Sequence, residues 1–213
     1  MNKKKRGLYA CFFKRMIDFL LSLLAIIILS PLLIALIITG AVAMRGNPFF
    51  LQQRPGMIDK TGKERIFNLI KFRTMTNERD AEGKLLPDGE RLNKYGLFLR
   101  MTSLDELPQL FNILTGGCSI IGPRPLLVRY LERYSEEQRR RHEVRPGLTG
   151  LAQVSGRNAL DWQSKFKLDV YYVDHLSFAL DLSIFFKTIK VVFSCRDVSS
   201  LTSATMEEFM GNH

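Results

Sequence analysis

The chain has 213 residues and a formal net charge of +10, from 31 lysine and arginine residues against 21 aspartate and glutamate residues. This length suits one domain with a hydrophobic core, alone or with a small appendage, and the basic excess favours polyanionic partners such as nucleic acid, anionic lipid or phosphorylated small molecules. Cys11, Cys118 and Cys195 lie far apart, which argues against a disulfide framework and a zinc cluster, and the histidines lack the i, i+4 pairing of zincin sites.

The first predicted element is a long apolar helix, because no residue from Phe19 to Met44 carries a charge. A straight helix of this length measures about 39 Å at about 1.5 Å per residue, and the hydrocarbon core requires only roughly 30 Å. The segment is longer than the apolar part of a signal peptide, and no small-x-small cleavage site stands out in it. We therefore expect a retained membrane segment.

A proline near the middle of this segment predicts a kink. Pro31, directly after Ser30, removes a backbone donor and clashes with the preceding turn. Both flanks of the segment are basic, and the positive-inside rule places such flanks in the cytoplasm. A re-entrant helix bent at this pair keeps both flanks on one side, whereas a kinked crossing helix leaves one basic flank outside. The charges favour the re-entrant helix.

A small β-hairpin is predicted next, from apolar and aromatic runs at 48–56 and 64–75 that a turn containing Gly62 separates. Lys71 and Arg73 alternate in the second run, so we expect them to share one strand face. That face could lie beside a nucleotide, beside lipid headgroups or in solvent.

The polar residues 76–94 include Gly and Pro and predict a long surface loop. Short helices are expected at 91–101, 103–115, 124–133 and 135–142.

Asp105 and Glu106 are adjacent acids at the expected start of the 103–115 helix. Ser103 with Glu106 three positions later matches a capping box, in which both acids would only support the helix start. The same position keeps a carboxylate ionised through local N–H groups and the helix dipole. An ionised Asp105 can attack phosphorus, and Glu106 can hold Mg²⁺. The local residues leave both interpretations open.

Several cations lie on stiff or glycine-rich backbone. Arg124 lies between two prolines, and its planar guanidinium suits phosphate, although a rigid loop with a surface arginine explains it equally well. The loop expected at 142–158 carries Arg145 and Arg157 among glycines that can bring N–H groups close to an anion. An acidic pair, rigid cations and a bilayer segment together suit magnesium-assisted phosphoryl transfer at a membrane surface.

The last part of the chain is expected to be helical at 159–176 and 178–193. Asp169 is expected to be a surface acid or a salt-bridge partner of the first helix rather than a catalyst. The second helix is largely apolar and belongs either in the core or in the membrane interface. The tail from Arg196 is polar and is expected to be mobile.

A series of motifs occurs along the chain in this order: KRMIDFLLSLLAIIILSPLLI, QQRPG, KFRTM, TSLDELPQLFNIL, IGPRPLL, RPGLTGLAQVSGRN and LDVYYV. In these motifs, from about Lys14 to Val192, the chain resembles the bacterial sugar transferases, the monotopic polyprenyl-phosphate phosphoglycosyl transferases. It is most similar to their minimal, catalytic-domain-only branch, which includes undecaprenyl phosphate N,N'-diacetylbacillosamine 1-phosphate transferases. The family often has Trp and Asn where this chain has Leu151 and Ser155.

The resemblance implies an α+β, mainly helical fold. It implies a re-entrant membrane helix broken at Ser30 and Pro31, a small β-hairpin, and short amphipathic or interfacial helices around a membrane-surface active site. We expect a basic N-terminus and membrane helix at 1–45, a catalytic domain at 46–195 and a C-terminal tail at 196–213. The implied location is the cytoplasmic face of the bacterial inner membrane.

The resemblance also implies a two-step covalent reaction. Asp105 attacks the sugar-bearing phosphate of a UDP-sugar and UMP leaves, after which undecaprenyl phosphate attacks the phosphosugar-aspartate. Glu106 is expected to bind Mg²⁺. The substrate-binding cations implied by the family motifs are Lys71, Arg100, Arg124 and Arg157.

The expected donor is UDP-N,N'-diacetylbacillosamine or a related N-acetyl sugar, with UDP-galactose or UDP-glucose for capsule or O-antigen as the alternative. The implied partners are the UDP-sugar, undecaprenyl phosphate and membrane lipids, with a homodimer or downstream glycosyltransferases as further partners and no nucleic acid. Rival functions are a membrane-bound phosphatase or lipid kinase with the same Mg²⁺ and Asp chemistry, and a basic membrane-tethered scaffold or nucleic-acid binder. Aromatic residues between cations, which single-stranded nucleic-acid binders use, are sparse here.

Overall fold

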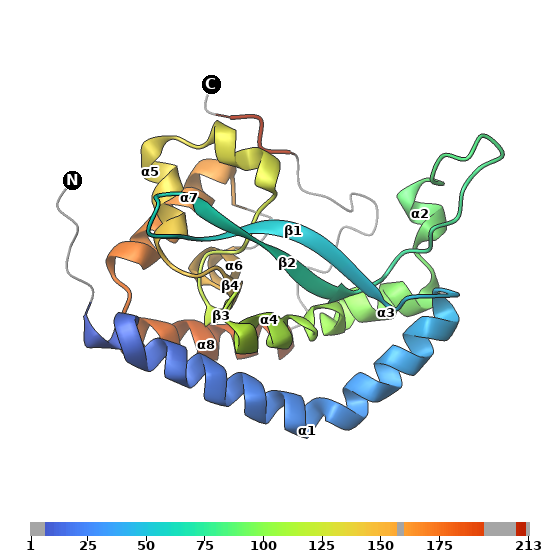
Figure 1. Cartoon of the computed structure of the whole chain (residues 1–213), viewed down its shortest axis with the longest axis horizontal. Helices are drawn as coiled ribbons and strands as arrows, with labels where there is room; N and C mark the ends of the chain where they lie inside the picture. Colours follow the sequence, from blue (N-terminus) through green and yellow to red (C-terminus); the bar gives the residue numbers. More distant parts are fainter. Residues whose placement is uncertain (1–6, 157–159, 194–207, 212–213) are drawn as a thin grey trace.

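A computed structural model describes residues 7–156, 160–193 and 208–211 of the chain. Its longest element is the helix α1 (Lys14–Ala43), which continues from a π-helical turn, η1 (Tyr9–Phe13), and runs along the underside of the molecule (Figure 1). The span Tyr9–Ala43 is long and apolar enough to cross a membrane by length and composition. The rest of the described chain is mainly helical with two small sheets, which confirms the α+β class.

The ribbon of α1 bends near its middle, yet the helix continues through Pro31 (Figure 1). Pro31 has no N–H to donate to the carbonyl oxygen of Ile27, one turn earlier. The Ser30 hydroxyl donates to that same oxygen at 2.8 Å and replaces the missing hydrogen bond. The structure therefore shows one bent helix, and the predicted break at Ser30 and Pro31 is not confirmed.

The first half of α1 turns polar side chains toward the domain. Lys14 Nζ forms a buried ion pair with Asp181 of α8 (Phe178–Phe193) at 2.7 Å. Asp18, one turn further along, accepts from the Ser119 hydroxyl at 2.7 Å and from the Ile120 N–H at 3.0 Å. Charged groups inside a membrane helix are stable only when paired, so these contacts bind the start of α1 to the domain.

The second half of α1 packs through apolar side chains. Leu33 and Leu36 are buried in a cluster with residues of the hairpin and of α3 (Lys94–Thr102). The Tyr95 hydroxyl donates to the Leu36 carbonyl at 2.8 Å, and the Asn93 amide donates to the Ala43 carbonyl at 3.1 Å. Both ends of α1 are thus bound to the same domain.

The predicted hairpin is confirmed as the antiparallel pair β1 (Phe49–Ile58) and β2 (Glu64–Phe72). Gly62 in the connecting turn has a φ of +83°, which a residue with a side chain adopts only with strain. Because β2 ends at Phe72, Arg73 lies just beyond the strand, so the prediction that Lys71 and Arg73 share a strand face is wrong for Arg73.

The polar segment at 76–94 is not a plain loop. It forms an arm, visible at the right of Figure 1, that contains an isolated bridge between Arg79 and Leu85 and the short helix α2 (Asp88–Arg91). Helix α3 begins later than expected because the Asn93 side chain accepts from the Gly96 N–H at 2.9 Å and caps it.

The predicted helix at 103–115 begins at Gln109 rather than at Leu104, where the capping-box pattern indicates its start. Ser103 has a φ of +56° and ends α3, and its side chain makes no capping hydrogen bond. Residues Leu104–Glu106 form a single 3-10 turn (η2), and α4 (Gln109–Thr115) follows Pro108. Proline suits the start of a helix, where no N–H is needed. The capping-box interpretation of Ser103 is therefore wrong.

The predicted loop at 142–158 contains regular structure. The strand β4 (Gly147–Thr149) pairs in parallel with β3 (Ser119–Ile121), and α6 (Leu151–Ser155) follows. A Cβ on Gly147 would lie 2.1 Å from the backbone nitrogen of Gly122. Gly147 therefore permits its own backbone and that of Gly122 to approach closely. This role differs from the predicted one, in which the glycines bring N–H groups close to an anion.

The crossover between β3 and β4 carries three short helices, η3 (Val128–Arg133), α5 (Glu136–Arg139) and η4 (Arg140–Glu143). The helix expected at 124–133 is thus a shorter 3-10 helix, and the one expected at 135–142 is divided. The chain then forms α7 (Trp162–Asp174) and α8, which confirms both predicted C-terminal helices.

The described part of the expected tail, residues 208–211, packs against the domain, and the rest of the tail from Arg196 lies outside the described residues. Phe209 is buried in an aromatic cluster with Tyr130, Tyr134, Trp162 and Phe166. The prediction of a mobile tail from its polar composition is wrong for residues 208–211, because burial of Phe209 favours docking of this segment.

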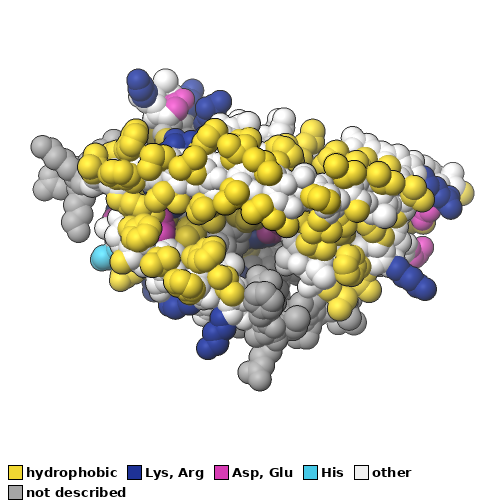
Figure 2. All heavy atoms as spheres, turned by 90° about the horizontal axis from the view of Figure 1, so that it is seen from below, with side chains coloured by type: hydrophobic (Ala, Val, Ile, Leu, Met, Phe, Trp, Pro, Cys, Tyr) yellow, Lys and Arg dark blue, Asp and Glu magenta, His cyan; other side chains and the backbone are white. Residues whose placement is uncertain are grey.

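The underside of the molecule exposes many apolar side chains, which Figure 2 shows from below. Helix α8 buries Ile184, which confirms the core location for one of its faces, and exposes apolar residues on the other face. A location of that other face in the membrane interface stays a prediction. An exposed apolar surface of this kind indicates contact with a membrane or a partner. Its members include Leu20, Leu24, Ile27, Ile28, Ile34 and Ile38 of α1 and Phe178, Leu182, Phe185 and Phe186 of α8.

Candidate active site

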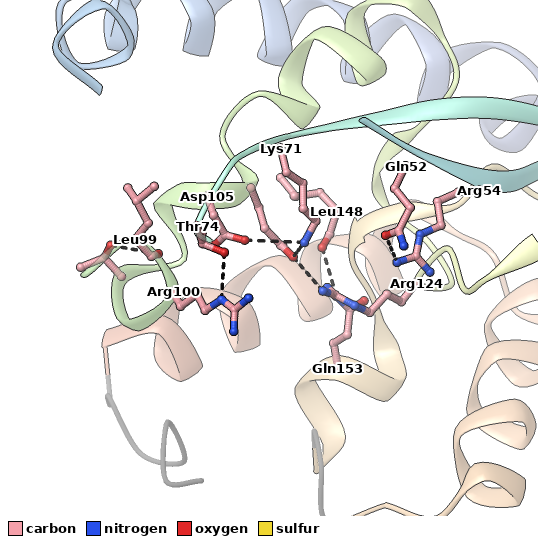
Figure 3. Close-up of polar contacts among 12 residues, drawn as sticks. Gln52, Arg54, Lys71, Thr74, Leu99, Arg100, Asp105, Arg124, Leu148 and Gln153 are labelled. Atoms are coloured by element: carbon pink, nitrogen blue, oxygen red, sulfur yellow. Dashed lines mark hydrogen bonds and ion pairs between the residues drawn. The ribbon is translucent and has the colours of Figure 1, made fainter. Parts of the chain in front are cut away.

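The adjacent acids lie close to two cations from other parts of the chain, and Figure 3 labels Asp105 and both cations. Lys71 Nζ, from β2, lies 2.7 Å from Oε1 of Glu106 and 3.7 Å from Oδ2 of Asp105. Arg124 Nη2 lies 2.7 Å from the same Glu106 oxygen. The Arg124 side chain remains 46% exposed, so it can reach a ligand as well as Glu106.

The two carboxyl groups differ in their tendency to ionise. Burial raises the pKa of Glu106, but the charges and hydrogen bonds of Arg124 and Lys71 outweigh it and lower this pKa to about 2. Burial raises the pKa of Asp105 above its ordinary value, and the nearby charge of Lys71 only partly opposes it. Glu106 is therefore a firmly held anion, whereas Asp105 is a more basic oxygen with a weaker cation contact.

Helix α4 and strand β2 fix the distance between the acids and Lys71. The Asn112 side chain accepts from the Ile70 N–H at 2.9 Å and donates to the Asn68 carbonyl at 2.8 Å, so it binds the strand beside Lys71. At the C-terminal end of α4, Arg15 of α1 donates to the carbonyls of Ile113 and Leu114. The helix that follows the acids is thus bound to β2 along its side and to α1 at its end.

The prolines around Arg124 are not the only support of its backbone. The Arg124 carbonyl accepts from Arg141 Nη2 at 2.7 Å, and Arg141 forms a buried ion pair with Asp169 of α7 at 2.7 Å. Asp169 is therefore the salt-bridge partner that the sequence predicts, but it is buried, and its prediction as a surface acid is wrong. Arg141 was not among the predicted residues, because only the fold brings it to Arg124.

The remaining predicted cations divide into two groups. Arg100 lies on the other side of Asp105, where its Nε donates to the Thr74 hydroxyl at 3.0 Å and its charge also opposes the rise in the pKa of Asp105. Arg157 lies outside the described residues. Arg145 does not join the acids but donates to the Gly116 carbonyl at the end of α4.

The structure adds Arg54 of β1, which lies beside Arg124 (Figure 3). Burial and the charge of Arg124 lower the pKa of Arg54 to about 10. The motif QQRPG contains this arginine, but nothing in its local sequence distinguishes it from any other strand residue.

The carboxylate oxygens suit Mg²⁺, which needs few protein ligands, better than they suit a metal whose ligands all come from the protein. No group of three or more His, Cys, Asp or Glu residues that could hold a metal occurs in the part of the chain that the structure describes. Mg²⁺ is commonly held by one or two carboxylates, with waters and substrate phosphates as its other ligands. Glu106, which stays ionised, meets that requirement with one carboxylate.

A comparison with known families identifies the family of this chain. The model of the family described as bacterial sugar transferase matches residues 9–195, nearly the whole chain. The chain belongs to the bacterial sugar transferase family.

This bacterial sugar transferase is 46% identical over 199 residues to an uncharacterized sugar transferase, EpsL, of Bacillus subtilis, and the match covers 93% of the chain and 96% of EpsL. It is 39% identical over 199 residues to the undecaprenyl-phosphate galactose phosphotransferase of Salmonella typhimurium, covering 85% of the chain and 40% of that protein. It is also 38% identical over 187 residues to the UDP-glucose:undecaprenyl-phosphate glucose-1-phosphate transferase of Klebsiella pneumoniae, covering 83% of the chain and 39% of that protein.

The chain therefore spans nearly all of EpsL but well under half of the two relatives whose names state a sugar. Membership of this family and the apolar helix α1 together indicate membrane association.

Proposed function

We propose that this bacterial sugar transferase moves a sugar 1-phosphate from a UDP-sugar to a polyprenyl phosphate and releases UMP. The observation that carries the proposal is the carboxylate pair, in which Glu106 is held ionised by two cations while the more basic Asp105 remains beside it. The names of the Salmonella and Klebsiella relatives describe this reaction type with undecaprenyl phosphate.

In the first step, an Asp105 carboxylate oxygen forms a bond to the phosphorus that carries the sugar. The bond from that phosphorus to the bridging oxygen breaks, and the oxygen leaves with the electron pair as part of UMP. Phosphoryl transfer of this kind depends on positioning and charge neutralisation, and Lys71, Arg100 and Arg124 supply positive charge around Asp105.

In the second step, a phosphate oxygen of the polyprenyl phosphate attacks the same phosphorus, and the Asp105 carboxylate leaves with its electron pair. The product is a polyprenyl-diphosphate sugar, and Asp105 returns to its starting state. A covalent intermediate divides one difficult transfer into two easier ones.

We expect Glu106 to hold Mg²⁺ together with the donor phosphates. When bound, the ion would neutralise phosphate charge. Because no group of three or more metal-binding side chains occurs among the described residues, Mg²⁺ should bind weakly without the UDP-sugar and more tightly with it.

We also propose that α1 enters and leaves the bilayer through the cytoplasmic face. A crossing helix separates its two ends by the thickness of the membrane, whereas both ends of α1 are bound to one domain, through Lys14 and Asp18 at its start and through Ala43 at its end. The bend and the basic flanks on both sides support the same orientation.

The donor sugar stays open among several classes. The names of the Salmonella and Klebsiella relatives state galactose and glucose. A further relative from Aeromonas hydrophila, 36% identical over 191 residues, is named for N-acetylgalactosamine. A donor of the N,N'-diacetylbacillosamine type remains our expectation from the sequence motifs, and a screen of UDP-sugars with undecaprenyl phosphate, measuring UMP, would decide it.

The test of the reaction is the release of UMP together with a trapped adduct. Wild-type protein incubated with its UDP-sugar but no acceptor should release UMP and gain the mass of one phosphosugar on the peptide that contains Asp105. Asp105→Asn should lose both signals at unchanged thermal stability.

An adduct on another residue, or near-normal turnover by Asp105→Asn, would contradict the assignment of the nucleophile. No UMP from any UDP-sugar, with phosphate release or lipid phosphorylation instead, would favour a phosphatase or kinase. A protein inactive in all three assays would favour a scaffold.

A further inference from the structure

Arg54 is a partly buried cation that the proposed reaction has not yet used. Its Nη2 donates to Gln52 Oε1 at 2.5 Å, while its Nε is buried without a hydrogen-bond partner among the described residues. Within the described chain Arg54 forms no ion pair with an acid. A guanidinium has five N–H donors, and buried donors normally have an acceptor in the protein, in water or in a ligand, so this side chain has donor capacity for a ligand oxygen.

Arg54 also lies beside a second positive charge. Arg124 is the charged neighbour that most strongly disfavours the protonated form of Arg54, and burial acts in the same direction. Two adjacent guanidinium groups repel each other, and an anion that contacts both removes this repulsion. Arginine forks suit phosphate oxygens in particular.

The order of the cations along the site indicates which phosphate this is. In Figure 3 they follow one another from Arg100 through Lys71 and Arg124 to Arg54, and Asp105 lies toward the Arg100 end. In phosphoryl transfer the attacking and leaving oxygens are roughly in line on opposite sides of phosphorus. An attack from Asp105 therefore directs the leaving group toward Arg124 and Arg54.

We propose that Arg54 binds the α-phosphate of the UDP-sugar, the phosphate that leaves as part of UMP. This inference rests on the proposed function. When the bond to the bridging oxygen breaks, that oxygen keeps the electron pair and UMP gains one negative charge. Arg54 and Arg124 neutralise this charge at the end of the site remote from Asp105.

The experiment compares Arg54→Gln with wild type and with Arg129→Gln, a matched control at an exposed arginine that pairs with Glu208. The full-length protein in detergent is assayed for inhibition by UMP, for exchange of labelled UMP into UDP-sugar without acceptor, and for the KM of polyprenyl phosphate. Arg54→Gln should raise the inhibition constant of UMP roughly 10-fold or more, as expected for a lost hydrogen bond to a charged group, and should slow exchange. The KM for polyprenyl phosphate should not change.

The outcomes distinguish an error in the role of Arg54 from an error in the proposed function. Unaltered UMP inhibition in Arg54→Gln, with normal exchange in wild type, overturns the role of Arg54 and leaves the proposed function intact. A changed KM for polyprenyl phosphate with unchanged UMP inhibition assigns Arg54 to the acceptor instead and also overturns it. Absence of exchange in wild type contradicts the proposed function itself. If Arg54→Gln does not fold, Arg54→Lys, which keeps the charge but not the fork, should raise the UMP constant less.

Discussion

At the scale of single residues, the site depends on an asymmetry between neighbours in the sequence. Asp105 and Glu106 share one turn, yet Lys71 and Arg124 both contact one Glu106 oxygen, whereas Lys71 lies 3.7 Å from Asp105. One acid therefore takes most of the stabilising charge. The other keeps a raised pKa and remains a better nucleophile once it is ionised.

This asymmetry predicts the acid limb of the pH profile. Only ionised Asp105 can attack, so kcat/KM for the UDP-sugar should rise with pH until the raised pKa of Asp105 in the free enzyme is passed. Because Lys71 is the cation that most lowers this pKa, Lys71→Met should move the acid limb to higher pH in addition to reducing the rate. Initial rates from pH 4 to pH 8 would measure the shift, with Arg129→Met as a control. A limb that stays in place in Lys71→Met would show that another group titrates.

At the scale of secondary structure elements, α1 continues through Pro31 because a side-chain donor replaces the missing backbone donor. The Ser30 hydroxyl supplies the hydrogen bond to Ile27 that Pro31 cannot make. This arrangement lets the helix bend without leaving a carbonyl oxygen unsatisfied in an apolar environment, where such a group costs several kcal/mol.

A double-mutant cycle tests this replacement. Ser30→Ala should lower the free energy of unfolding by about 1 kcal/mol, because the Ile27 carbonyl loses its donor. In a Pro31→Ala background the backbone N–H of residue 31 is restored, so the same serine substitution should cost little. Thermal unfolding of the four proteins in one detergent measures the coupling between the two sites. Additive effects would mean that the hydroxyl does not compensate for the proline.

The elements also show what the sequence could and could not predict. The hairpin and the C-terminal helices follow from local patterns, namely apolar runs around Gly62 and the apolar periodicity of 178–193. The capping-box pattern at Ser103 is equally local, but it predicts the wrong helix start, because the helix begins only after Pro108. The three-residue strands β3 and β4 are too short for any periodicity and exist only through pairing with each other.

The same distinction applies to the candidate site. Asp105, Glu106, Lys71, Arg100 and Arg124 could be named because family motifs carry them, and the structure brings them together. Arg141 contacts Asp169 and the backbone of Arg124, and Arg54 lies beside Arg124, and in both cases the neighbour is distant in the sequence. No local spacing indicates such contacts, so they had to come from the fold.

At the scale of the whole molecule, the orientation of α1 decides where the chemistry occurs. Both ends of this helix are bound to the domain, and its outer face is apolar (Figure 2). The carboxylate pair is thereby fixed relative to this apolar surface. The proposed soluble donor and lipid acceptor can meet only if that surface holds the site near the headgroups.

Cysteine labelling tests this orientation. In a protein whose native cysteines are replaced by serine, Gly7→Cys and Lys63→Cys should both react with a membrane-impermeant maleimide in inside-out vesicles and neither in intact spheroplasts. Both positions are exposed in the structure and lie on opposite flanks of α1. Labelling of the two positions from opposite sides would establish a crossing helix and contradict the re-entrant one.

The ion pair between Lys14 and Asp181 has a consequence for how the protein is made. The lysine leaves the ribosome early, whereas its partner belongs to the last described helix and follows after most of the chain has been synthesised. During translation the nascent helix therefore lacks the partner that Lys14 has in the folded protein. The contact between the start of α1 and α8 can form only when synthesis is nearly complete.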